Sequence, residues 1–150
     1  MKKVINLLLA VLTTGCVSAQ WTYKTVDNGF DEPYKIAHTA ENNGAFLKLE
    51  KVDTFVIWYI QGGYYCDDKP DIDVVFVVKG VNKKYNLKGT KNEKNNVVFF
   101  PWNLDIDENL NADFKGASSV KIRINESYCT SEVYEFNMSN SKADYDFMIK

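Results

Sequence analysis

The sequence has a single histidine, His38, and only three cysteines in 150 residues. A zinc site needs three or four ligands, usually histidine or cysteine, so this inventory argues against one. A serine or cysteine hydrolase would have to use His38 as its base. There is no G-x-S-x-G motif, and Gly62-Gly63 precedes tyrosines instead of a phosphate-binding loop. We therefore expect no catalytic residues, no metal and no cofactor; a hydrolase built around His38 and a paired-carboxylate glycosidase are the alternatives.

Long apolar runs are equally scarce. The one run, from Val4 to Leu12, is too short to cross a bilayer, which takes about 20 residues. It follows a Lys-Lys pair and precedes small residues that end at Ala19, the pattern of a secretion signal. We expect residues 1–19 to be a signal peptide and residues 20–150 to form one exported domain without a transmembrane segment, periplasmic or secreted.

The same stretch supports a second interpretation. Gly15-Cys16 at the end of the apolar run is typical of a lipoprotein, which would be anchored at Cys16. However, Thr13 stands three residues before the cysteine, where a bacterial lipobox usually has Leu. Val17 and Ala19 fit the small-residue rule for signal cleavage. Cleavage near Ala19 is favoured, and the lipoprotein is the alternative.

A basic surplus is also absent. The chain has 18 basic and 20 acidic residues, and loss of Lys2 and Lys3 with the signal leaves 16 against 20, a net charge of −4. Proteins that bind nucleic acid usually have a basic face, so we expect no nucleic-acid partner. The many Asn, Lys, Ile and Tyr residues, together with the signal, favour a bacterial or phage source.

Two cysteines remain outside the signal, Cys66 and Cys129. An even pair in an exported protein indicates one disulfide, whichever way the N-terminus is processed. A free catalytic thiol is the alternative.

Strand signals dominate the rest of the chain. Runs of β-branched and aromatic residues alternate with clusters of Asn, Asp, Gly and Lys, and no linker or repeat interrupts them. This pattern predicts a mainly β fold, an antiparallel β-sandwich or barrel with one or two short helices. The nine expected strands cover residues 21–26, 34–39, 45–50, 54–60, 72–79, 84–88, 97–102, 119–125 and 132–138.

One predicted strand is apolar on both faces. In "TFVIWYI", Phe55, Ile57 and Tyr59 point one way, while Val56, Trp58 and Ile60 point the other. The run "VVFVV" at residues 74–78 behaves similarly. Such strands need a cover on both faces, so we expect a second sheet on one side and a helix or a partner on the other.

Two segments indicate helices. Residues 107–116 place Leu110 and Phe114 four apart and end at Gly116. Residues 141–149 offer Ser141 and Asp144 as a capping box, although the tail also alternates like a strand.

The segment around the first helix also resembles the start of a calcium loop, because Asp105, Asp107 and Asn109 set oxygen donors at every second position. The match then fails, since Leu110 replaces the required Gly and Gly116 replaces the required Glu. A capped, solvated helix is the favoured interpretation.

Candidate contact residues come from two features. Aromatic residues make up 14% of the chain, more than a core of this size needs, so some could contact a sugar or a protein. The segment "CDDKPDID" offers an acidic loop, for which a solvated turn is the alternative. The candidates are Trp21, Trp58, Tyr64, Tyr65, Asp67, Asp68, Asp71 and Trp102.

The segments "DVVFVV", "YNLKG", "SSVKIRI" and "VYEFNMSNSKADYDF", with a Trp after the signal and two cysteines, resemble the small exported proteins of the invasion-associated locus B type and related type VI secretion-associated proteins. The resemblance implies a β-sandwich with a small terminal helix and carries over no catalytic residue. It departs at Asn140-Ser141, where such proteins tend to have Gly. "YYCDDKPDIDVVFV" is similar to the first strand pair of periplasmic lysozyme inhibitors, but their inhibitory Ser-Gly loop is not found.

These features together predict a non-catalytic binding protein of the bacterial envelope. The expected partner is a protein of the envelope or outside the cell, which would make the chain an inhibitor or a secretion accessory. A carbohydrate-binding module that uses exposed aromatic residues is the alternative.

Overall fold

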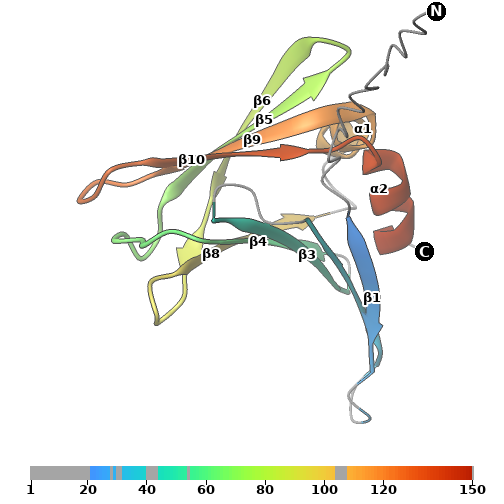
Figure 1. The fold of residues 1–150 in the computed structure, drawn as a ribbon, viewed down its shortest axis with the longest axis horizontal. Helices are drawn as coiled ribbons and strands as arrows, with labels where there is room; N and C mark the ends of the chain where they lie inside the picture. Colours follow the sequence, from blue (N-terminus) through green and yellow to red (C-terminus); the bar gives the residue numbers. More distant parts are fainter. Residues whose placement is uncertain are drawn as a thin grey trace, which may run out of the picture.

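The protein is a two-layer β-sandwich with two short helices at one end (Figure 1). The computed structural model describes residues 21–27, 29, 32–39, 44–53, 55–103 and 108–149. Every strand pair in both sheets is antiparallel. The predicted fold class is therefore confirmed as a sandwich, and the described strands do not close into a barrel.

The first sheet has six strands in the order β1-β2-β3-β4-β8-β7. Its consecutive hairpins follow from short polar turns between the apolar runs. The strands are β1 (Thr22–Val26), β2 (Tyr34–His38), β3 (Phe46–Val52), β4 (Phe55–Gln61), β7 (Thr90–Lys91) and β8 (Val97–Asn103).

The second sheet has four strands in the order β10-β9-β5-β6. They are β5 (Asp71–Val78), β6 (Val81–Lys88), β9 (Ala117–Asn125) and β10 (Glu132–Asn137). The helices are α1 (Glu108–Gly116), which leads directly into β9, and α2 (Ser141–Ile149), which follows β10. None of the described helices is long and apolar enough to cross a membrane.

An aromatic core joins the two sheets. Trp58 on β4 is 1% exposed and stacks on its cross-strand neighbour Phe100, with ring centroids 5.6 Å apart. Across the sandwich it meets the edge of Phe76 on β5 at 6.1 Å, and Phe114 of α1 at 5.7 Å. These contacts bury a large apolar area, which is the main force that holds the sheets together.

All nine predicted strands are present, with shifts of one to three residues at their ends. The two-residue strand β7 has no sequence signal because it is too short for a periodic pattern. The helical interpretation of residues 141–149 is confirmed, whereas the strand alternative is not.

The predicted capping box of α2 is wrong. The Ser141 hydroxyl shares its proton between the carbonyl oxygens of Lys115 and Ala117, at 3.0 and 2.9 Å. It therefore fastens the start of α2 to the junction of α1 and β9. The first backbone bond of α2 runs from the Asp144 N–H to the carbonyl of Asn140.

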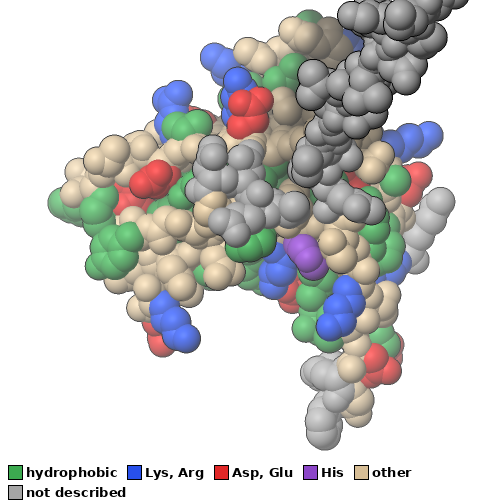
Figure 2. Space-filling view, viewed as in Figure 1, with side chains coloured by type: hydrophobic (Ala, Val, Ile, Leu, Met, Phe, Trp, Pro, Cys, Tyr) green, Lys and Arg blue, Asp and Glu red, His purple; other side chains and the backbone are tan. Residues whose placement is uncertain are grey.

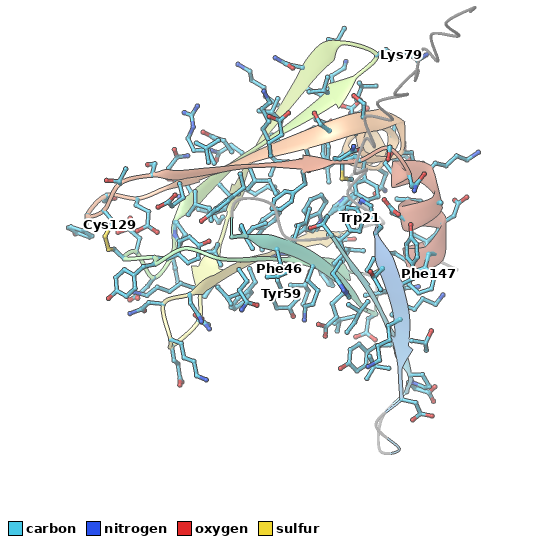
Figure 3. All side chains as sticks on the ribbon, in the orientation of Figure 1. Trp21, Phe46, Tyr59, Lys79, Cys129 and Phe147 are labelled. Atoms are coloured by element: carbon cyan, nitrogen blue, oxygen red, sulfur yellow. A yellow bond between two sulfur atoms is a disulfide. The ribbon has the colours of Figure 1, made fainter. Side chains whose placement is uncertain are left out.

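The first hairpin leaves the sandwich and packs against α2 (Figure 3). The Tyr23 hydroxyl of β1 donates a short hydrogen bond to the Asp144 carboxylate, and the Tyr23 ring lies 5.1 Å from the Phe147 ring. Asp144 is fully buried, and its second oxygen has no partner among the described residues. Burial raises the pKa of Asp144 to about 6, although the Tyr23 bond opposes the shift. Burial and Asp144 also raise the pKa of Tyr23.

We expect Asp144→Asn to be more stable than the wild type by about 3 kcal/mol at pH 7.5, with the difference vanishing below about pH 3. Because the pKa of Asp144 rises from 3.8 to about 6 on folding, the folded protein binds this proton more tightly than the unfolded chain. The stability contributed by the proton is present at low pH and is lost as the pH rises through 6. Urea unfolding at a series of pH values measures the difference.

Tyr23→Phe is the matched control. It removes the donor that stabilises the charged carboxylate, so the pKa of Asp144 in the folded protein should rise further. The fall in the free energy of unfolding should then continue to a higher pH than in the wild type. An Asp144→Asn variant whose stability follows the wild type at every pH would contradict the assignment.

Candidate binding surfaces

The end of the sandwich opposite the helices is closed by a disulfide (Figure 3). Cys66 in the connection from β4 to β5 is bonded to Cys129 in the turn from β9 to β10, with Cα atoms 5.9 Å apart. The predicted disulfide is thus present. We call residues 62–70, 92–96 and 126–131 the disulfide end.

Hydrogen bonds brace the two loops that the disulfide joins. The Cys66 N–H donates to the Glu126 carboxylate at 2.6 Å, and the Ser127 N–H donates to Asp67 at 2.7 Å. The Lys91 ammonium donates to the Cys66 carbonyl at 2.7 Å. Charge-assisted bonds of this kind are among the stronger ones, so the loops are held in one arrangement.

The third loop of the disulfide end, residues 92–96, is also fixed. The Asn92 side chain accepts from the N–H groups of Asn96 and Val97 at 3.0 and 3.1 Å. Asn95 adopts a φ of 58°, a left-handed conformation that Asn tolerates well. Its carbonyl accepts from the Tyr65 N–H at 2.8 Å, and its amide lies 3.4 Å from the Tyr64 hydroxyl.

The acidic loop does not form one convergent carboxylate site. Asp68 pairs with Lys91 at 3.2 Å, and Asp71 pairs with Lys88 on the neighbouring strand. Asp67 accepts a hydrogen bond from the Ser127 N–H in the turn from β9 to β10. Each predicted acidic residue therefore has its own structural contact, and only Asp68 is highly exposed, with 89% of its side chain accessible.

Four of the five predicted aromatic contact residues lie in the core, so this part of the prediction is wrong. They are apolar enough to pack between the sheets, and none is more than 4% exposed: Trp21, Trp58, Tyr65 and Trp102. Tyr64, in contrast, is 67% exposed. Tyr128, which the sequence did not single out, is 88% exposed at the same end. Its position beside a disulfide cysteine, in a turn rich in Ser and Thr, was the available signal.

A second surface lies on the outer side of the six-stranded sheet. Phe55, Ile57 and Tyr59 of β4 point away from the core, as their alternation predicts, and no described segment packs over them (Figure 3). Three of their six cross-strand neighbours are apolar as well, namely Val52, Phe99 and Pro101, and the other three are Lys48, Glu50 and Asn103. We call the outer side chains of β2, β3, β4 and β8 the uncovered face: Tyr34, Ile36, His38, Phe46, Lys48, Glu50, Val52, Phe55, Ile57, Tyr59, Gln61, Val97, Phe99, Pro101 and Asn103.

An ion pair is embedded in the apolar part of this face. The Lys48 ammonium lies 2.6 Å from the Glu50 carboxylate and 3.9 Å from the centre of the Tyr59 ring. Burial and the Glu50 charge raise the pKa of Tyr59. The Tyr59 ring in turn lies 6.0 Å from Phe99. The two charges therefore neutralise each other and leave the face close to neutral at this point.

The hairpin of β1 and β2 bends down beside the uncovered face and gives it a side wall (Figure 1). The pairing of β2 with β3 ends at Ile36 and Glu50, and the strands then separate. A hollow of about 570 Å³ opens at this point, lined by residues 32–35 and 50–53. The face is thus bounded on one side by the hairpin and its hollow.

The remaining candidates give little support to catalysis or metal binding. His38 lies on β2 opposite Thr22 and Lys48 in register, and its side chain makes no hydrogen bond or ion pair to any described residue. Among the described residues, one cluster of metal-ligating type has atoms within 4.8 Å, Cys66, Glu126 and Cys129, but its sulfur atoms are joined in the disulfide. Of the calcium candidates, Asn109 is exposed on α1, while Asp105 and Asp107 lie outside the described residues, as do Cys16 and Ala19.

Reduction of the disulfide should lower the free energy of unfolding by about 4 kcal/mol, the chain-entropy value for a loop of this length. The bond closes a separation of 63 residues and links the connection between β4 and β5 to the turn between β9 and β10. Urea unfolding with and without a reducing agent measures the loss. A Cys66→Ser/Cys129→Ser variant should match the reduced protein and respond no further; equal stability of oxidised and reduced protein would contradict the expectation.

Gly63→Ala should destabilise the protein by about 1–3 kcal/mol, because an added methyl overfills this site. A Cβ at Gly63 would lie 2.6 Å from the Tyr134 hydroxyl oxygen and 2.9 Å from the Tyr65 ring. Those two hydroxyls are hydrogen-bonded to each other at 3.0 Å inside the core. Thermal unfolding tests the expectation. The same change in a Tyr134→Phe background should cost less, and an equal cost would show that the Tyr134 hydroxyl is not the obstacle.

Comparison of the chain with models of known protein families, with curated proteins and with solved structures finds no match. The two resemblances noted in the sequence therefore remain predictions, and the function is argued from the surfaces of the molecule alone.

Proposed function

We propose that this chain is an exported, non-catalytic binding protein of the bacterial envelope that contacts a protein partner through the uncovered face. One observation carries the proposal: β4 is apolar on both sides, and only one of them is covered by the described part of the chain. Export rests on the signal pattern of residues 1–19.

The composition of the uncovered face favours a protein over a sugar. Its most exposed apolar side chains include Phe46, Val52 and Phe55, which are 38–41% exposed. Phenylalanine and valine have no polar group for sugar hydroxyls, whereas they pack well against apolar side chains of another protein. Exposed contiguous apolar patches are typical of interaction sites in soluble proteins.

The size of the face favours a separate partner over a second copy of the chain. A face of four strands, the longest of them seven residues, covers roughly 400 Å² at the usual strand spacing and rise. A standard stable interface takes about 800 Å² from each partner. The uncovered face alone is about half of that, so we expect a modest-affinity partner that reaches the neighbouring hairpin of β1 and β2 as well.

The first step of the test is to identify the partner by position. A photo-crosslinking amino acid placed at Phe46 or Phe55 in cells should trap one discrete protein. The same amino acid at Val133, which is 60% exposed on the outer side of the second sheet, is the matched control and should not trap it. Equal trapping at the two surfaces would contradict the proposal.

The second step uses the purified partner. Phe55→Asp should weaken binding by at least tenfold, because it places a charge in the apolar contact. It should leave the free energy of unfolding within about 0.5 kcal/mol of the wild type, as for most surface substitutions. Val133→Asp should change neither quantity. A Phe55→Asp protein that binds the partner with wild-type affinity in isothermal titration calorimetry would overturn the proposal.

A further inference from the structure

We infer that the disulfide end is a separate glycan-binding site, in which the rings of Tyr64 and Tyr128 stack on sugar rings. This site is distinct from the uncovered face and does not depend on the protein partner proposed above. Hydrophobic side chains reach the surface at this end of the molecule (Figure 2).

The two tyrosines are the large hydrophobic side chains that the disulfide end exposes. They come from loops 64 residues apart in the sequence, and the bond between Cys66 and Cys129 brings those loops together. An aromatic ring offers a flat apolar face to the C–H groups of a pyranose, and the tyrosine hydroxyl offers a polar edge. Tyr64 and Tyr128 thus provide both kinds of contact that a sugar needs.

Polar side chains surround the two rings. Asn95 lies at the Tyr64 hydroxyl, and Asp68 projects from the same loop as Tyr64 with most of its side chain accessible. Ser127 and Thr130 stand on either side of Tyr128 and Cys129 in the sequence, and both are exposed. Carboxylates accept hydrogen bonds, amides and hydroxyls both donate and accept, and sugar hydroxyls require this mixture.

The backbone on both sides of each tyrosine is fixed before any ligand binds. Tyr64 follows Gly63, which packs closely against the side chains of Tyr65 and Tyr134. It precedes Tyr65, whose N–H donates to the Asn95 carbonyl in the 92–96 loop. Tyr128 lies between Ser127, which is bonded to Asp67, and the disulfide. Holding a binding group in place lowers the entropic cost of association, which matters most for weak, solvent-exposed ligands such as glycans.

The surroundings of the rings distinguish this site from the uncovered face. A protein interface usually centres on a contiguous apolar cluster, as the uncovered face does. At the disulfide end the exposed aromatic rings stand among amide, hydroxyl and carboxylate groups. Lys91 pairs with Asp68, and the other carboxylates, Asp67, Glu93 and Glu126, stand against Lys69 and Lys94 in the charge count, so no single charge dominates. This chemistry fits a neutral or weakly charged polysaccharide better than a protein or a polyanion.

Affinity electrophoresis tests the inference. The purified protein is run in native gels that contain hydroxyethyl cellulose, glycol chitin, xylan or mannan, and it is also applied to an array of bacterial surface polysaccharides. At least one of these probes should retard or retain the wild type. Tyr64→Ala and Tyr128→Ala should each weaken binding of that probe about tenfold or more, whereas Tyr64→Phe, which keeps the ring, should stay within about threefold.

Phe55→Ala is the matched control, because it removes an exposed ring from the uncovered face and should leave the affinity for the polysaccharide unchanged. Both tyrosines are exposed, so near-ultraviolet circular dichroism should show that the alanine variants remain folded. Saturation-transfer NMR with the retained glycan should place its protons against tyrosine rings in the wild type only. The inference is overturned if no probe binds the wild type, or if the Tyr64→Ala/Tyr128→Ala protein binds as tightly as the wild type.

Discussion

The contact of Trp58 with the opposite layer is the interaction on which the rest of the structure depends. Trp58 touches its own sheet through Phe100, the second sheet through Phe76 and the first helix through Phe114. One side chain thereby sets the separation of the two sheets and the position of α1. Its indole N–H is buried without a hydrogen-bond partner among the described residues, a cost that the burial of so large an apolar ring system exceeds.

The two ends of the sandwich are closed by different means. The helices at one end mainly cover the core, whereas the loops at the other end are free to carry exposed contact residues. At one end, α1 and α2 cover the core and are joined through Ser141 and the carbonyls of Lys115 and Ala117. At the other end, Tyr65 anchors one loop in the core, and a covalent bond and charge-assisted hydrogen bonds fix the loops to one another. Loops held in this way can carry exposed side chains such as Tyr64 and Tyr128, and functional residues are often found on such loops.

Local pattern predicted most of the architecture, because strand alternation and turn composition act over a few residues. It could not predict which aromatic residues face solvent. Trp58 and Tyr59 are neighbours in one apolar strand, and only the position of the second sheet decides that Trp58 is buried while Tyr59 lies on the uncovered face. The capping box failed for the same reason. Ser141 meets the carbonyls of residues that are 24 and 26 positions away, and no local rule includes them.

For the candidate surfaces too, the sequence indicates local features but not those assembled from distant segments. The sequence suggested Tyr64 from its aromatic character, Asp67 and Asp68 from an acidic turn, and the disulfide from an even pair of cysteines, all of which are visible without the fold. The uncovered face draws its residues from four strands, so the sequence indicated only that β4 required a second cover.

The contact of the first hairpin with α2 also orders the folding of the chain in time. Tyr23 and Asp144 are 121 positions apart, and the Trp21 indole donates to the carbonyl of Asn137 across 116 positions. Contacts of such long range form late, because most of the chain must already be in place. During folding, β1 and β2 therefore complete this contact only after α2 has formed. A chain that lacked α2 would therefore leave the first hairpin without this contact.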